Sequence, residues 1–564
     1  MSEIKTHLSR AQVSRAAIEK LYIAMRHLFI RGSYKPLGIS GEAMIKALLE
    51  LKPEIYGSIA NPEKVELVGL HYVFQRLPQG IEECTFIRLI SREGLESSGS
   101  PVIIPAKRRR NCYRIDEEQM YIEMTRGRSD IYDVLTHLTF MYIEAEKIRT
   151  NALDHKGRTK RDWQKLAKII QKIKHQEKFD KLVAINYLST LLGRTYQETV
   201  DAVRLFEETD KVNSLFNVVY WLGKLSINEY LDDYDREITF SSSLRSKIGF
   251  HIFGTSWAHN IKLKLKEKNL LGRPLHIISS NLHSVLNTIF AKAALQSKLK
   301  SKTFDDIIIK LSQQKNDKLQ ELVRSSALKN GMTEMTDETG VNIGVQIFDC
   351  AAIPVNNLPV AVKCQLPQEK EKIPVLLVMD YAFGEQAYEL MDELLKPYEE
   401  GTTKINLNVR SVNIMGKAGI LEGKKGDLMI PNAHVFEGTA HNYPFENQLT
   451  VEEFRESGLD VYAGSMVTVL GTSLQNKDVL RYFAKSSWKS IGLEMEGAHY
   501  QKAIQAASKI RNSIDKSVCL RYAYYASDNP LETGSTLASG GLGVDGVKPT
   551  YAITVAILKG IFGQ

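Results

Sequence analysis

Two glutamates near the end of the chain have the type and spacing of a sugar-binding pair. Glu494 and Glu496 follow an apolar run at residues 491–493. If this run forms a strand, both carboxylates turn toward one face, because side chains two residues apart in a strand point the same way. Such a pair can accept hydrogen bonds from a vicinal diol, and a ribose offers one. Gly497 then lets the backbone leave the strand, and residues 498–507 are predicted to form a helix.

A second polar pair, Ser527 and Asp528, follows about thirty residues later. The apolar run at residues 518–526 predicts a strand that ends at this pair. In open α/β sheets, ligands bind beyond the carboxyl ends of the strands. A carboxyl group in that place could donate a proton, so Asp528 is a candidate general acid.

These two segments together resemble the purine nucleoside phosphorylase and nucleosidase superfamily. Within it, the sequences LEMEG and ASDNPLE are most similar to those of AMP nucleosidases and methylthioadenosine/adenosylhomocysteine nucleosidases. The resemblance implies that Glu496 holds the ribose hydroxyls, with Met495 against the sugar and Glu494 beside it. It also implies that Asp528, which follows Ser527, protonates the leaving purine.

The resemblance extends to the order of five elements and covers about half of the chain. These elements are residues 279–283, 381–384, 416–419 with Gly426 and Asp427, 494–496, and 527–528. In the family, the first loop lines the phosphate or water site, which places Ser279, Ser280 and Asn281 there. Gly416 and Gly419 are expected in a turn that brings backbone donors near a ligand oxygen. The same glycines also suit a close approach of two backbones without a ligand.

Lys417 departs from the family pattern, and this departure bears on whether water or phosphate captures the sugar. Phosphorylases of the superfamily often carry an arginine just before this turn, where this chain has Ile414, and a threonine within it. Without the bidentate arginine, hydrolysis is favoured over phosphorolysis, and inorganic phosphate is the alternative co-substrate. Lys417 itself suits a substrate phosphate, such as that of AMP.

The first loop, residues 279–283, also departs from the family pattern, because it carries no carboxylate to activate water. Asn281 and His283 are the polar residues it offers. A histidine can act as a base near neutral pH, so His283 is a candidate catalytic residue. The alternative is that His283 lies at a helix start and plays no catalytic part.

These residues predict cleavage of an N-glycosidic bond in a purine nucleoside or nucleotide, with hydrolysis like that of AMP nucleosidase favoured. Two alternatives stay open: a phosphate-dependent phosphorylase, and a regulatory protein whose site binds a nucleotide without cleaving it. No metal or organic cofactor is expected. The candidates for contact with the base are Phe436, Tyr443, Phe445 and Leu470.

Composition narrows the class of protein. The 564 residues are 43% hydrophobic and 25% charged, which is typical of a globular protein of two to four domains. The net charge of +8 is modest for this length, so a small-molecule partner is expected rather than nucleic acid. The five scattered cysteines, with no apolar membrane or signal segment, predict a cytoplasmic protein. The resemblance implies a homo-oligomer.

The hydrophobic pattern suggests three segments that together form an α/β protein. Residues 1–150 are expected to form an α+β module, with a helix over about 9–50 and short strands at 65–70, 84–90 and 120–124. Residues 151–268 are expected to be helical and basic. Residues 269–564 alternate strands with helices, which predicts a nucleoside-phosphorylase-like mixed sheet flanked by helices. The strands expected there include residues 275–278, 344–348, 361–364, 374–379 and 411–415.

Overall fold

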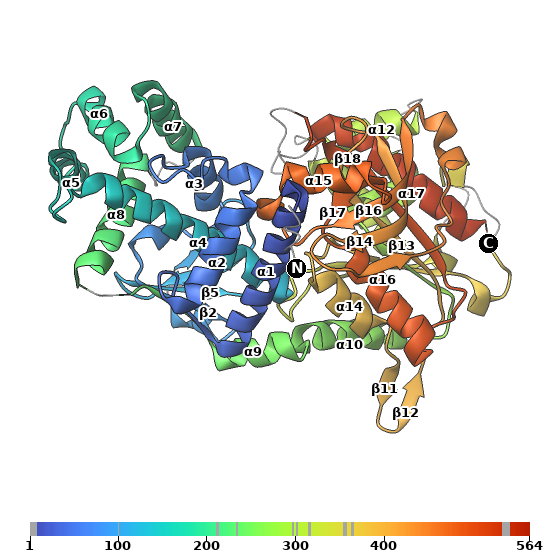
Figure 1. Ribbon diagram of the computed structural model, residues 1–564. Helices are drawn as coiled ribbons and strands as arrows, with labels where there is room; N and C mark the ends of the chain where they lie inside the picture. Colours follow the sequence, from blue (N-terminus) through green and yellow to red (C-terminus); the bar gives the residue numbers. More distant parts are fainter. Residues whose placement is uncertain are drawn as a thin grey trace, which may run out of the picture. The chain divides into compact units, whose positions relative to one another are not determined.

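A computed structural model describes residues 8–99, 101–209, 214–232, 235–295, 298–299, 303–313, 317–353, 358–362, 366–532 and 542–563 (Figure 1). The chain forms two compact units. Unit 1 comprises Met1–Phe250 with Ser473–Val479, and unit 2 comprises His251–Thr472 with Leu480–Gln564. The expected boundary at residue 150 lies within one long buried helix, α4 (Gly127–Ala152). Because α4 packs against elements on both sides of that position, the predicted first and second segments form one unit.

Unit 1 is built on a six-stranded sheet in the order β1-β6-β2-β5-β4-β3, in which β6, β2 and β5 run parallel. The strands are β1 (Ser33–Tyr34), β2 (Phe86–Ile90), β3 (Val102–Ile103), β4 (Cys112–Arg114), β5 (Gln119–Glu123) and β6 (Glu237–Phe240). The helices besides α4 are α1 (Arg10–Arg31), α2 (Ile39–Leu51), α3 (Leu67–Phe74), α5 (Arg161–Lys174), α6 (Lys181–Leu192), α7 (Tyr196–Thr209), α8 (Leu215–Asp232) and α9 (Ser242–Gly249).

Local signals explain where the first helices begin and end. Ser9 and Gln12 form a capping box at the start of α1, and Gly32 ends the helix with φ of +87°. The expected helix over 9–50 is therefore two helices. The strand predicted at 65–70 is wrong, because the Glu66 carboxylate accepts hydrogen bonds from the backbone of Val68 and Gly69 and so caps α3. The strands predicted at 84–90 and 120–124 are confirmed as β2 and β5.

Unit 2 is built on a mixed ten-stranded sheet, which confirms the α/β class predicted for this part of the chain. Its order is β15-β14-β16-β17-β13-β7-β10-β9-β8, and β18 pairs with β13 and β14. The strands are β7 (Leu275–Ser279), β8 (Met332–Met335), β9 (Val345–Asp349), β10 (Val375–Met379), β13 (Val409–Ile420), β14 (Leu428–Phe436), β15 (Asn442–Pro444), β16 (Val461–Thr468), β17 (Ser490–Glu494) and β18 (Cys519–Asp528). A separate hairpin joins β11 (Tyr398–Glu400) to β12 (Thr403–Ile405).

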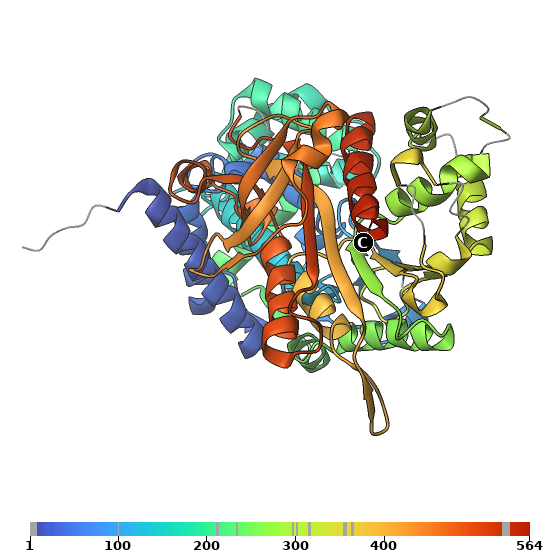
Figure 2. The same cartoon turned by 90° about the vertical axis from the view of Figure 1, so that its right-hand side faces the viewer.

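The helices of unit 2 cover both faces of this sheet. They are α10 (Ile252–Glu267), α11 (Leu282–Leu295), α12 (Phe304–Leu311), α13 (Asp317–Lys329), α14 (Gln386–Leu394), α16 (Gly497–Gln505) and α17 (Val547–Phe562), while α15 (Lys477–Lys485) starts in the unit 1 segment. Along β18, Tyr525 belongs to the core that includes α17, whereas the Tyr522 hydroxyl donates to Gln501 of α16. Alternate β18 side chains therefore face α17 on one side of the sheet and α16 on the other. Figure 2 shows α17, the red helix at the C-terminus, beside the orange strands of this sheet.

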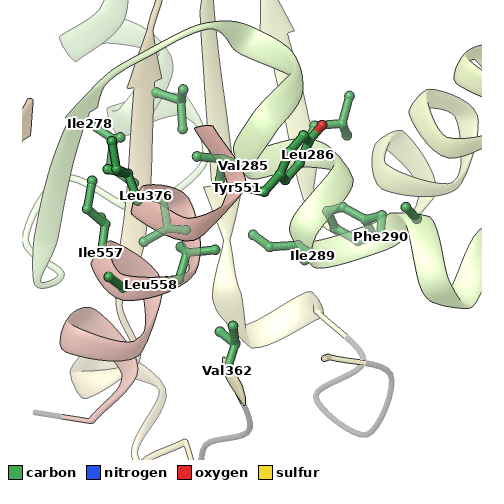
Figure 3. Packing of buried hydrophobic residues seen from close by; sticks show 14 of the residues in the cluster. Ile278, Val285, Leu286, Ile289, Phe290, Val362, Leu376, Tyr551, Ile557 and Leu558 are labelled. Carbon is green, nitrogen blue, oxygen red and sulfur yellow. The ribbon is translucent and has the colours of Figure 1, made fainter. Parts of the chain in front are cut away.

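The core on the α17 side holds the strands that carry the candidate site. Apolar side chains from β7, β10, α11 and α17 converge there, and nearly all of them are fully buried. Figure 3 shows Ile278, Val285, Leu286, Ile289, Phe290, Leu376, Tyr551, Ile557 and Leu558 packed in this way. Since β10, β7, β13 and β18 are successive parallel neighbours, their carboxyl ends meet at one edge of the sheet.

Two predicted features of unit 2 are wrong. Residues 416–419 continue β13 instead of forming a turn, because their pairing with β18 carries the strand on to Ile420. The strand expected at 361–364 is a short 3-10 helix, Val360–Val362, in its described part, and residues 363–364 lie outside the described residues.

Candidate functional site

Glu494, the last residue of β17, is buried and holds the turn into α16. Its Oε1 accepts a hydrogen bond of 2.5 Å from the Thr468 hydroxyl, and its Oε2 accepts bonds from the backbone amides of Glu496 and Gly497. Burial raises the pKa of Glu494 to about 8, with a further contribution from nearby Glu496, while these hydrogen bonds oppose the shift. Glu494 therefore shapes the segment that presents Glu496.

Glu496 lies beyond the strand, at the start of α16, with φ of −122° and ψ of −25°. The expectation that Glu494 and Glu496 share one strand face is wrong, because the strand ends at Glu494. The Glu496 Oε1 accepts a hydrogen bond of 2.8 Å from the backbone amide of Gly384, and the side chain stays partly exposed, as does Met495. Glu496 is thus joined to the loop that follows β10.

Gly497 is required by a close approach and not by a turn. A Cβ atom at this position would lie 2.2 Å from Cδ2 and 2.3 Å from Nε2 of His434, which is fully buried. The absence of a side chain lets α16 start directly against β14.

Asp528 is a buried carboxyl group whose two oxygens differ. Oδ1 accepts a 2.5 Å hydrogen bond from the Ser527 hydroxyl, whereas the buried Oδ2 has no hydrogen-bond partner among the described residues. Burial raises the pKa of Asp528 above its ordinary value, and the Ser527 bond and the charge of Lys417 oppose that rise. A carboxyl group that keeps its proton to higher pH and has a free oxygen suits proton donation.

A bulge sets the position of Asp528. Ala418 pairs with Ala526, but Gly419 pairs with Asp528, so Ser527 is an extra residue in β18. Such a bulge re-aims the side chains that follow it. Gly416 and Gly419 therefore belong to the strand that borders Asp528, and the Gly416 backbone is covered by Tyr381, whose Cε1 would lie 3.6 Å from an added Cβ.

The residues of the first loop mostly hold the scaffold. The Ser279 hydroxyl lies 2.9 Å from the hydroxyl of Tyr500, and Ser280 is fully buried with its hydroxyl on the carbonyl of Asn281. Asn281 caps α11 by accepting from the backbone amide of Ser284 at 2.8 Å. These contacts leave Asn281, of the three predicted residues, at a cavity wall.

A cavity of about 870 Å³ lies beside these strand ends, and we name it the Lys417 cavity. Asn281, His283 and Lys417 line it, but Glu496 and Asp528 are not among its lining residues. Lys417 links the two places, since its charge acts on Asp528. Solvent reaches His283, yet surrounding protein atoms lower its pKa by desolvation while Asp380 opposes the shift. His283 is therefore neutral at neutral pH and able to accept a proton.

Tyr381 lies in the predicted element 381–384, but the sequence assigned no role to its side chain. It follows the end of β10, and its hydroxyl accepts a hydrogen bond of 3.4 Å from Asn281 and contacts Tyr525 of β18. The side chain thus reaches from β10 to β18 across the carboxyl edge, above Gly416. Its position directly after a buried strand was the signal available in the sequence.

The four candidate base-binding residues make three separate sets of contacts. Phe436 and Tyr443 form an edge-to-face pair with centroids 6.2 Å apart, whereas Phe445 stacks on buried His434 at 5.3 Å. The Leu470 amide donates to Glu437 at 2.6 Å.

In the described part of the chain, no cluster of three or more His, Cys, Asp or Glu side chains could hold a metal ion. Nor is any described helix long and apolar enough to cross a membrane.

The chain belongs to the family of unknown function DUF6909, whose profile matches residues 42–301 and 306–563. No curated protein matches the chain. Several solved structures are similar over about half of it. The 5′-methylthioadenosine/S-adenosylhomocysteine nucleosidase of Campylobacter jejuni is 11% identical, with a TM-score of 0.31, over 52% of this chain and 100% of its own. The futalosine hydrolase of Helicobacter pylori strain 26695 is 13% identical, with a TM-score of 0.29, over 51% of this chain and 96% of its own.

Proposed function

We propose that unit 2 is a purine nucleoside or nucleotide N-ribosidase that cleaves the N-glycosidic bond with water, in the manner of an AMP nucleosidase. The observation that carries the proposal is Asp528, a buried carboxyl with a raised pKa and a free Oδ2 at the carboxyl end of the parallel strands of a mixed sheet. An unpaired buried oxygen costs folding free energy, and a hydrogen bond to the substrate would explain why the protein keeps one here.

In the proposed reaction, Asp528 protonates a nitrogen of the departing purine through Oδ2. The bond from the sugar to the base breaks as its electron pair moves onto the purine. Glu496 accepts hydrogen bonds from the ribose hydroxyls, which requires it to exchange the Gly384 amide for the substrate or to use its second oxygen. Water adds to the cationic sugar carbon and gives up its proton to neutral His283. Lys417 pairs with the 5′-phosphate of a nucleotide.

A second candidate is a nucleotide-sensing protein that binds without cleavage. One observation favours it: Glu496 and Asp528 are not in the lining of the Lys417 cavity. In this candidate, a nucleotide bound in the Lys417 cavity does not reach the Asp528 carboxyl.

Incubation of the full chain with AMP, adenosine, inosine and methylthioadenosine, each with and without phosphate, separates the candidates. Free base without phosphate supports hydrolysis, and free base only with phosphate identifies a phosphorylase. Tight binding measured by calorimetry with no base released contradicts the enzyme and supports the sensor. The same samples, passed through size exclusion with light scattering, test the expected homo-oligomer.

A further inference from the structure

Unit 1 contains a cavity of about 810 Å³ that the proposed function does not use, and we name it the Trp221 cavity. It lies at the amino ends of β2 and β6, where Thr85 and Arg236 precede the two strands. The amide of Glu237 donates to the Thr85 carbonyl at 3.0 Å, which places these ends side by side. Thr85, Leu225 and Arg236 are nearly inaccessible and form its deep part, whereas Trp221 and Lys224 of α8 are half-buried above them.

Two buried donors in this lining lack partners. Glu229 takes Nε and Nη2 of Arg236 at 2.6 Å each, and the guanidinium carbon lies 4.1 Å from the ring centroid of Tyr142. Arg236 Nη1 has no hydrogen-bond partner among the described residues, and neither does the Thr85 hydroxyl. Arg236 is 2% exposed, so bulk water does not compensate for the missing acceptor.

The remaining lining decides the charge and shape of a ligand. The Lys224 ammonium lies 4.5 Å from the centroid of the Trp221 ring and forms no ion pair within the described ranges. Glu83 pairs with Arg114 at 3.0 Å, but Glu117 and Glu118 are exposed at the mouth. The lining cations Arg236, Lys174 and Lys224 are matched in number by Glu229, Glu117 and Glu118, so a single negative charge fits this cavity better than the two of a phosphate.

We propose that the Trp221 cavity binds a small organic acid with a flat apolar body. Its carboxylate accepts hydrogen bonds from Arg236 Nη1 and the Thr85 hydroxyl, and its apolar part lies along Trp221 and Leu225. Lys224 adds attraction for the anion from the half-buried side. A charge-assisted bond to a buried arginine gives such a site its preference for a carboxylate over a neutral amide.

Calorimetry on the full chain tests the charge requirement with benzoate and 3-phenylpropanoate, their neutral amides, and inorganic phosphate. We expect an acid to bind with a change in tryptophan fluorescence, and its amide to bind at least about tenfold more weakly, because the amide cannot pair ionically with Arg236. Absence of binding by both acids at millimolar concentration overturns the proposal. So does equal binding of acid and amide, or tighter binding of phosphate.

Two variants test whether the acid binds in the Trp221 cavity. Arg236 is left intact because its removal strands the buried Glu229 carboxylate and endangers folding. Thr85→Val keeps the side-chain shape and should weaken the acid about fivefold to tenfold through loss of one hydrogen bond. Lys224→Met should weaken it severalfold. Lys168→Met, at an exposed position of α5, is the matched control and should leave the Kd unchanged. Unchanged Kd values in both cavity variants overturn the proposal.

Discussion

The chemistry proposed for unit 2 depends on a difference in hydrogen bonding between two buried acids, Glu494 and Asp528. Glu494 has both oxygens engaged by Thr468 and backbone amides, so its raised pKa accompanies a structural task. Asp528 has one oxygen held by Ser527 and the other free. Both acids are buried near a strand end, and it is the hydrogen-bond partners that distinguish the acid able to react from the one that holds the fold.

The replacement Asp528→Asn should lower kcat by roughly 10²–10⁴-fold if Asp528 is the general acid, since the amide cannot donate the proton in the same way. Free purine is measured by chromatography, with circular dichroism as a check on folding. Asp460→Asn is the matched control, because the Asp460 side chain pairs with Lys424 at an exposed position and the variant should keep full activity. Full turnover by the Asp528→Asn variant contradicts the assignment of Asp528 as the general acid.

The pH dependence of kcat should be bell-shaped. Asp528 must be protonated, and burial raises its pKa, so the rate should fall as pH rises through a pKa above that of a free aspartic acid. His283 must be neutral, and desolvation lowers its pKa, so the rate should fall on the acid side below its ordinary value of 6.5. His283→Gln should remove the acid-side fall and keep the other. A profile unchanged by His283→Gln excludes it as the base.

At the scale of elements, the site depends on how closely α16 approaches β14. The turn from β17 into α16 combines the Glu494 hydrogen bonds with a glycine that has no room for a side chain. The bulge at Ser527 acts in the same way on β18, where one extra residue places Asp528 beside Gly419. Backbone geometry at two strand ends thus presents Glu496 and Asp528.

The replacement Gly497→Ala should lower the unfolding free energy of unit 2 by about 1–3 kcal/mol, because the new Cβ overlaps buried His434. Urea unfolding followed by circular dichroism measures the change. Gly272→Ala is the control, since an added Cβ there meets no atom within 4 Å, and it should change stability by less than about 0.5 kcal/mol. Equal effects of the two replacements contradict the proposed close packing.

At the scale of the whole molecule, unit 1 is completed by a segment from far along the chain. Residues Ser473–Val479 belong to unit 1 although they follow most of unit 2. The Asn476 side chain donates to the Leu51 carbonyl at 2.9 Å and accepts from the amides of Asp478 and Val479. The amide of Glu54 donates to the Gln475 carbonyl at 2.9 Å. These bonds join the end of α2 to the late segment.

The replacement Asn476→Ala should therefore loosen the end of α2, because the Leu51 carbonyl and two backbone amides lose a buried partner. We expect a loss of about 1–3 kcal/mol in local stability, seen as faster hydrogen exchange of the amides near residues 51–56. Asn186→Ala, at an exposed position on α6, is the control and should leave this exchange unchanged. Equal exchange in both variants contradicts the role given to the segment.

Local patterns predicted much of the fold of unit 2 and two of the strands of unit 1, β2 and β5. Continuous apolar runs located β7, β10, β17 and β18, because strands buried on both faces are apolar along their length and end at polar residues. The pattern failed at α3, where one glutamate cap outweighed a β-prone run, and at residues 416–419, where glycines suggested a turn but pairing with β18 continued the strand. At α3 the deciding hydrogen bonds are local, whereas at residues 416–419 they come from a strand distant in the chain.

By itself, the sequence determined which residues could do chemistry: Glu496, Asp528, Lys417 and His283 lie at predicted strand or helix ends. Only the tertiary structure decided how they are used. It turned Glu494 into a structural acid, left Oδ2 of Asp528 without a partner, extended Tyr381 across the sheet edge and completed unit 1 with residues from beyond position 472. The reason is physical: burial, pairing register and hydrogen-bond partners arise between segments distant in the chain, and local periodicity contains no information about them.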